Sequence, residues 1–404
     1  MNQEEQETTE SQSTVSTTST QLIVVAQLRR QLTDLMRIDD HMITKPPDAI
    51  ITFRGQIHGD TEAAFEHITE RFVPLGYTAT LQEQPGGRHE VTAIKGIFDH
   101  KPGQVWVNVA LFLATLLSVL YIGALNELDP AAVQGRNDLE VMLLPLTHLQ
   151  YLYRGFPFAG TLLSILLVHE LSHYFVARRY GSPVSLPYFI PMPFSLLGTM
   201  GAVIVQRAPM RDRKTLFDIG VAGPLGGLIV AIPLLILGLT LSNVQPPPAD
   251  VDVVLQEGNS LLYLGVKYLI FGKILPSNGE DVWLHPIAFA AWAGLLVTMI
   301  NLIPVGQLDG GHVSYGLLGR RSQTLGYAII AMMVAWGGWM MLSGNEAGGF
   351  WITWGFLNMF LNPRHPPPLN DATRLDWRRI ALGLLVLAIF ILLFMPAPLR
   401  QVQL

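Results

Sequence analysis

The chain has 404 residues, half of them apolar and only 14% charged, and its mean hydropathy is +0.36. Soluble domains carry roughly 25% charged residues, so this composition indicates a polytopic membrane protein. The net charge of −5 argues against nucleic acid as a partner, and the lack of cysteine excludes disulfides and thiolate metal sites. Any metal must therefore be bound by histidine, aspartate or glutamate.

The chain begins with an acidic segment, residues 1–20, that is rich in serine and threonine and has no lysine or arginine. A secretory signal needs a basic start and an apolar core, and transit peptides are rich in arginine. This segment matches neither pattern, and its composition predicts a disordered tail.

Residues 21–103 are predicted to form a small soluble α+β domain. Residues 21–38 have a helix-like pattern, whereas residues 51–57 alternate as a half-buried strand does. A second helical pattern follows Asp60, a candidate N-cap, and two further alternating runs follow that helix. The predicted order after the first helix is β-α-β-β, and nothing in this domain points to a chemical function.

The remaining residues, 104–404, are predicted to form an all-α membrane domain. An α-helix needs about 20 apolar residues to cross a bilayer. The apolar runs are 106–124, 158–178, 216–241, 285–304, 324–342 and 380–396, with a shorter one at 347–361. They predict a bundle of about six to eight transmembrane helices. The basic residues between these runs predict that the N-terminal domain lies in the cytoplasm. If the short run 347–361 spans the membrane, the C-terminus lies on the opposite side.

One apolar stretch, residues 182–206, contains four prolines and is therefore not predicted to be a helix. Basic residues flank it on both sides, so it should enter and leave the membrane on one face. Non-helical backbone at membrane depth is tolerated only where protein or a water-filled cavity satisfies it. The stretch is therefore predicted to be a re-entrant β-hairpin.

The strongest chemical signal is HELSH, within the apolar run 158–178. His169 and His173 are four residues apart, so a helix projects both from one face, with Glu170 beside them. This H-E-x-x-H spacing is typical of zinc hydrolases, in which two imidazoles bind the metal and the carboxylate acts as a base. The alternative is a polar patch packed between helices, but ionisable residues within a membrane are costly and usually functional.

A second polar island, NLIPVGQLDGGH, spans residues 301–312. Pro304 is expected to end the helix before it. A catalytic zinc site needs a third protein ligand, and Asp309 and His312 are both candidates. Either residue could instead be an ordinary turn residue.

Together the two islands resemble the site-2 protease family of intramembrane zinc metalloproteases, which pairs H-E-x-x-H with N-x-x-P-x-x-x-L-D-G. The resemblance covers roughly residues 155–320, the expected catalytic core. It implies that His169, His173 and Asp309 bind one zinc ion per chain. It also implies that Glu170 is the general base.

The family resemblance extends to the proline-rich stretch. Gly198-Thr199-Met200-Gly201 resembles the family's G-x-x-G on a membrane-embedded hairpin, which makes Gly198 and Gly201 candidate substrate-binding residues. Asn301 is a candidate for steadying an oxyanion or orienting the substrate, with a helix-bending role as the alternative. The stretch 223–227 lacks the asparagine that many bacterial relatives have there.

The resemblance implies an integral membrane protease, in a plasma or thylakoid membrane, that cleaves transmembrane segments of protein substrates within the lipid bilayer (regulated intramembrane proteolysis). Residues 242–284 are too few for the PDZ domain of some relatives, so the chain is more similar to the plastid and cyanobacterial branch. A non-proteolytic zinc-binding membrane scaffold or transporter is the alternative, which the presence of Glu170 disfavours. Prenyl-protein proteases also use H-E-x-x-H, but their third ligand is a glutamate.

Overall fold

The computed structural model describes residues 22–44, 50–98, 103–246, 253–277, 279–361 and 363–403. They form two compact units. Unit 1 contains the described residues up to 98 together with two later segments, 208–213 and 367–374, and unit 2 contains the other described residues. The predicted tail, residues 1–20, lies outside the described residues.

Unit 1 is built on an antiparallel sheet in the order β1-β2-β4-β3. Its elements are a helix over residues 22–32, β1 (Met36–Ile43), β2 (Ile51–Ile57), α2 (Thr61–Phe72), a 3-10 turn (Val73–Leu75), β3 (Tyr77–Gln84) and β4 (Arg88–Lys95). Alternate residues of β2 and one face of α2 are buried in a common core, as their periodicity predicted.

The beginning of unit 1 differs from the prediction. The first helix ends at residue 32 rather than 38, and the following residues form the additional strand β1. β1 is an edge strand and most of its side chains are exposed, so it lacks the alternating apolar pattern that identifies a half-buried strand. The predicted cap at Asp60 is confirmed, because its carboxylate accepts hydrogen bonds from the N–H groups of Glu62 and Ala63.

The two later segments of unit 1 extend the sheet beyond β3. Leu81 donates its N–H to the carbonyl of Leu369 at 2.7 Å and accepts from the N–H of Asp371 at 2.8 Å. Leu369 in turn donates to the carbonyl of Met210 at 2.9 Å. Ala372 is buried in the core of unit 1. The unit is thus assembled from three separate stretches of the chain.

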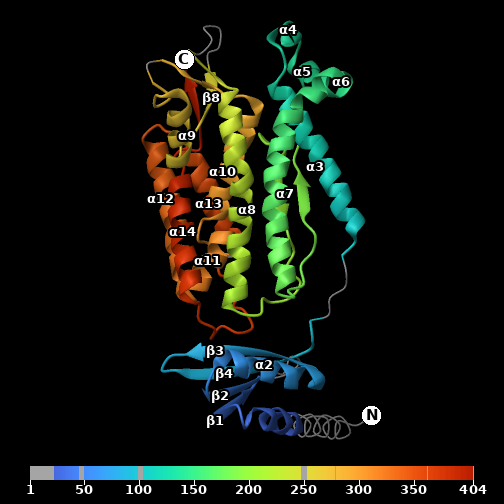
Figure 1. Ribbon diagram of the computed structural model, residues 1–404, viewed down its shortest axis with the longest axis vertical. Helices are drawn as coiled ribbons and strands as arrows, with labels where there is room; N and C mark the ends of the chain where they lie inside the picture. Colours follow the sequence, from blue (N-terminus) through green and yellow to red (C-terminus); the bar gives the residue numbers. More distant parts are fainter. Residues whose placement is uncertain are drawn as a thin grey trace, which may run out of the picture. The chain divides into compact units, whose positions relative to one another are not determined.

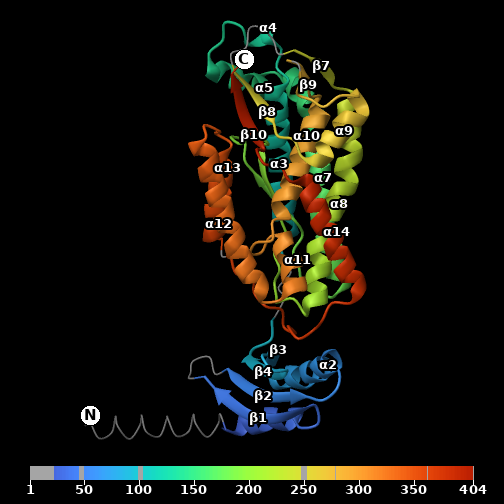
Figure 2. The ribbon, with the colours of Figure 1, turned by 90° about the vertical axis from the view of Figure 1, so that its left-hand side faces the viewer.

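Unit 2 is a bundle of helices that run alongside one another (Figure 1, Figure 2). Its helices are α3 (Val105–Asn126), α4 (Pro130–Val133), α5 (Asp138–Thr147), α6 (Leu149–Leu152), α7 (Phe156–Arg179), α8 (Arg213–Thr240), α9 (Leu261–Phe271), α10 (Pro286–Asn301), α11 (Asp309–Leu318), α12 (Arg321–Leu342), α13 (Gly348–Phe360) and α14 (Trp377–Leu393). α7 packs against α3 and α10, and α12 packs against α13.

Four helical segments of the described residues are long and apolar enough to cross a membrane: Val105–Asn126, Leu149–Arg179, Arg213–Thr240 and Arg321–Leu342. The helix within the predicted run 285–304 is shorter than that run, because α10 begins at Pro286 and ends at Asn301. α10 and α11 lie end to end, separated by the turn over residues 302–308 (Figure 1, Figure 2). Pro304 and Gly306 of that turn interrupt the helix, as the sequence predicted.

Three two-stranded sheets complete unit 2. They are β5 (Tyr188–Pro191) with β6 (Thr199–Val203), β7 (Asn243–Gln245) with β9 (Asp281–Trp283), and β8 (Val253–Glu257) with β10 (Leu399–Gln403). The proline-rich stretch is therefore a β-hairpin, β5–β6. Buried Asn108 of α3 donates to the carbonyls of Leu186 and Pro187, at 2.9 and 3.0 Å, and so fixes the hairpin against α3.

Candidate metal centre

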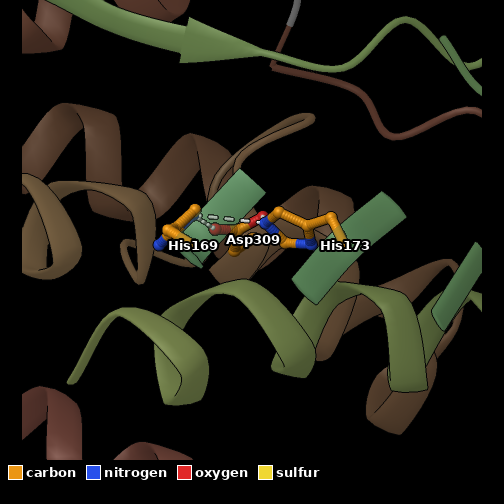
Figure 3. A group of neighbouring side chains, drawn as sticks. All are labelled: His169, His173 and Asp309. Atoms are coloured by element: carbon orange, nitrogen blue, oxygen red, sulfur yellow. Dashed lines mark hydrogen bonds and ion pairs between the residues drawn. The ribbon is translucent and has the colours of Figure 1, made fainter. Parts of the chain in front are cut away.

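Two side chains of α7 and one of α11, which lies far along the chain, converge inside unit 2 (Figure 3). Nε2 of His169 lies 3.1 Å from Oδ2 of Asp309, and Nε2 of His173 lies 3.2 Å from Oδ1 of the same carboxylate. The two Nε2 atoms are 3.2 Å apart. Within the described ranges, these are the only three His, Asp or Glu side chains grouped closely enough to hold a metal ion together.

The chemistry and spacing of these three donors fit zinc. Ligand atoms bound tetrahedrally at about 2.0–2.1 Å from zinc lie roughly 3.3 Å apart, close to the separations observed here. Nδ1 of His173 lies 2.7 Å from the carbonyl oxygen of Ile219, which can only accept, so this nitrogen carries the proton. Nε2 of His173 is thereby left with the lone pair that metal binding requires.

Local backbone structure explains why the carboxylate reaches the two imidazoles. The histidines are one turn apart on α7, and Asp309 is the first residue of α11. A Cβ on Gly310 would lie 2.1 Å from the carbonyl oxygen of Leu302, and one on Gly311 would lie 2.2 Å from that of Gly306. Only glycine at both positions allows α11 to start this close to the preceding turn.

A row of glycines on α8 faces the metal ligands. A Cβ on Gly223 would lie 2.0 Å from Nε2 of His173, and one on Gly227 would lie 3.3 Å from Nδ1 of His169. A Cβ on Gly226 would lie 2.1 Å from Oγ of Ser172. The GPLGG stretch, which sequence reasoning noted only for its missing asparagine, therefore provides space for the ligand-bearing face of α7.

We expect Gly223→Ala to weaken zinc binding by at least roughly tenfold, because the new methyl group must displace the His173 imidazole. Competition with a chromophoric chelator on the purified protein measures the affinity. Gly338→Ala is the matched control, since a Cβ on this α12 glycine would meet nothing within 4 Å. Equal affinities for the two variants would contradict the role assigned to the α8 glycines.

The structure separates the two candidates for the third ligand. His312 is one turn beyond Asp309 on α11, but its Nδ1 lies 2.6 Å from Nε2 of His365 and it does not join the cluster. Asn301 lies at the end of α10, with its Nδ2 3.5 Å from Nε2 of His169. It is thus close enough to the site to touch a substrate held there.

Glu170 is next to the first histidine and is 7% exposed. Within the described part of the chain, its carboxylate has no hydrogen-bond or salt-bridge partner. An unpaired buried carboxylate is costly for stability and is suited to proton transfer.

Gly198 and Gly201 lie on the β5–β6 hairpin, and both have positive φ angles, 74° and 97°. Gly198 packs against α3, where Ser118 Oγ donates to its carbonyl oxygen at 2.6 Å. Gly201 lies on β6, which among the described strands pairs only with β5. The N–H and the carbonyl of Gly201 are hydrogen-bonded to Oγ1 of Thr199, at 3.0 and 3.2 Å, and the edge of β6 away from β5 pairs with no described strand.

Comparison with known proteins shows which family and which curated relatives this chain resembles. Residues 157–343 match the model of Peptidase family M50. A probable zinc metalloprotease EGY1, chloroplastic, from Arabidopsis thaliana is 31% identical over 373 residues, covering 85% of this chain and 66% of the relative. The EGY1 protein of Oryza sativa subsp. japonica is 27% identical over 383 residues, covering 86% and 62%.

A second Arabidopsis thaliana relative, the probable zinc metalloprotease EGY2, chloroplastic, is 27% identical over 400 residues, covering 92% of this chain and 66% of the relative. The chain thus spans just under two thirds of the length of these curated relatives. No solved structure matches it.

Proposed function

Because the chain belongs to peptidase family M50, the site-2 protease family of zinc metalloproteases, we propose that it cleaves membrane proteins within their transmembrane segments. The observation that carries this proposal is the buried group of His169, His173 and Asp309 on apolar helices of a membrane protein. Zinc is the cofactor, and these three residues would hold it and leave a fourth position open.

The proposed reaction is hydrolysis of a peptide bond. When bound, zinc acidifies a water molecule and polarises the scissile carbonyl. Glu170 takes the proton of the attacking water and delivers it to the leaving amide nitrogen. Asn301 orients the substrate carbonyl. A protein that only stored or carried zinc would have no use for Glu170.

The hairpin supplies the place where the substrate binds. A transmembrane helix satisfies its own backbone hydrogen bonds, so its peptide bonds become accessible only when it locally unwinds. We propose that β5–β6 lies within the membrane as a re-entrant hairpin and that the unwound segment pairs with the edge of β6 away from β5, as in β-strand addition. A Cβ on Gly201 would meet nothing within 4 Å, so the space beside this part of β6 is open.

The proposed topology follows from the distribution of basic residues. We propose six to eight membrane passes, with α10 and α11 counted as one broken helix. The lysine and arginine residues between these passes favour a cytoplasmic position for unit 1. The curated relatives are described as chloroplastic, which favours a thylakoid or related membrane over a plasma membrane for this chain.

Reconstituted protein tests the proposed function directly. We expect zinc-dependent cleavage of a single-span substrate whose transmembrane helix contains a Gly-Pro pair, and much slower cleavage of a matched span of leucine and alanine. A chelator should abolish cleavage and added zinc should restore it. Absence of cleavage of both substrates by the zinc-loaded protein would refute the proposal, and equal rates would refute the need for unwinding.

A further inference from the structure

Beside the metal centre lies a second histidine pair that the proposed chemistry does not use. His365, from the segment between α13 and α14, is 5% exposed and meets His312 of α11. The ring of Tyr315, also on α11, lies 4.8 Å from the ring of His365, centroid to centroid. Two side chains one turn apart on α11 thus enclose His365.

The direction of the hydrogen bonds in this pair follows from the acceptor at its end. Nδ1 of His365 lies 2.6 Å from the carbonyl oxygen of Pro366, so Nδ1 carries the proton. Burial lowers the pKa of His365 to about 4, so its ring is neutral at pH 7 and its Nε2 can only accept. Nδ1 of His312 is therefore the donor, and the bonds run from His312 to His365 to the Pro366 carbonyl.

Helix α11 depends on such contacts for its position. It has only 10 residues, its N-cap Leu308 makes no side-chain capping bond, and two glycines follow Asp309. Each of these features weakens a helix in isolation. On one side α8 packs directly on α11, because a Cβ on Gly220 would lie 2.6 Å from Cβ of His312.

His365 contacts α11 from a rigid segment. Three consecutive prolines, 366–368, follow it, and each fixes its own φ angle. The backbone next to His365 is therefore restricted, and the His312–His365 bond ties α11 to it.

We propose that His365 is a positioning residue of the metal centre, which holds α11 through His312 so that Asp309 stays within ligand distance of the α7 histidines. This inference rests on the proposed function in one respect, the assignment of Asp309 as a zinc ligand.

Two substitutions of His365 separate its hydrogen bonds from its packing. Glutamine offers a carbonyl oxygen to His312 and an N–H to Pro366, whereas phenylalanine keeps a ring against Tyr315 and makes neither bond. We expect His365→Phe to weaken zinc binding of the full-length protein by roughly 10- to 100-fold and His365→Gln to change it less than about threefold. The measurement is competition with a chromophoric chelator, without substrate.

His312→Phe removes the same hydrogen bond from the other side, so it tests the proposal independently of the His365 variants. It should weaken zinc binding about as much as His365→Phe does, and the double variant should show no further loss. Additive losses, or wild-type affinity in both phenylalanine variants, would overturn the proposal. Equal losses in His365→Gln and His365→Phe would also overturn it, because the ring rather than the hydrogen bonds would then matter. A wild-type protein that binds zinc but cleaves no substrate would refute only the proposed function.

Discussion

Replacing Glu170 with glutamine is expected to lower kcat by at least about a hundredfold while the purified protein keeps its zinc. Glutamine has nearly the same shape as glutamate but cannot take up a proton from water. Because no described residue makes a hydrogen bond or salt bridge to the Glu170 carboxylate, the substitution breaks no such contact. Metal analysis and cleavage of the Gly-Pro substrate, both on the same preparation, give the two readouts.

Glu127→Gln is a suitable control for this experiment. Glu127 follows the last residue of α3, and burial raises the pKa of its carboxyl group, yet it does not belong to the metal centre. This variant should cleave at the wild-type rate. Retained cleavage in Glu170→Gln would remove Glu170 from the mechanism, whereas loss of zinc in that variant would show that it supports the metal instead.

The second large effect is expected at Asp309. If each protein ligand contributes a similar share of the binding free energy, its loss costs about 3–5 kcal/mol, which is a decrease in zinc affinity of roughly a hundredfold or more. Asp309→Ala should therefore be purified nearly free of zinc and be inactive. Equilibrium dialysis against buffered zinc followed by elemental analysis measures both affinity and stoichiometry.

His312→Phe provides the contrast, because His312 was the other candidate ligand in the sequence. Its ring contacts His365, so the variant should still bind one zinc at saturating metal, with the smaller loss of affinity expected of a positioning residue. A reversed result, with zinc retained in Asp309→Ala and lost in His312→Phe, would exchange the two assignments.

The sequence predicted those parts of the site that depend on local geometry. The spacing of His169 and His173 places them on one face of whichever helix contains them, and the structure shows both on α7. Pro304 likewise predicted the break between α10 and α11. The order Asp309-Gly310-Gly311 indicated a close backbone approach, although not which element it would meet.

Other features were not predictable because they depend on contacts between distant residues. Gly223 and His173 are 50 positions apart, and only the packing of α8 on α7 brings them together. His365 lies in a proline-rich segment with no pattern that indicates burial. The choice between Asp309 and His312 also required the structure, since both follow the same turn. The family resemblance favoured Asp309, and the geometry supports that choice.

The sheet of unit 1 has a consequence for biosynthesis. Its four N-terminal strands leave the ribosome early, but the segment that pairs with the edge of β3 follows only at residues 367–374, after the segment 208–213 that pairs with it in turn. At about 5–20 residues per second, translation takes roughly 15 seconds to a minute to reach the second segment. During that time the edge of β3 is an unpaired template for aggregation. A nascent chain of this protein therefore needs a chaperone, or fast membrane insertion, for longer than the size of its N-terminal domain alone would suggest.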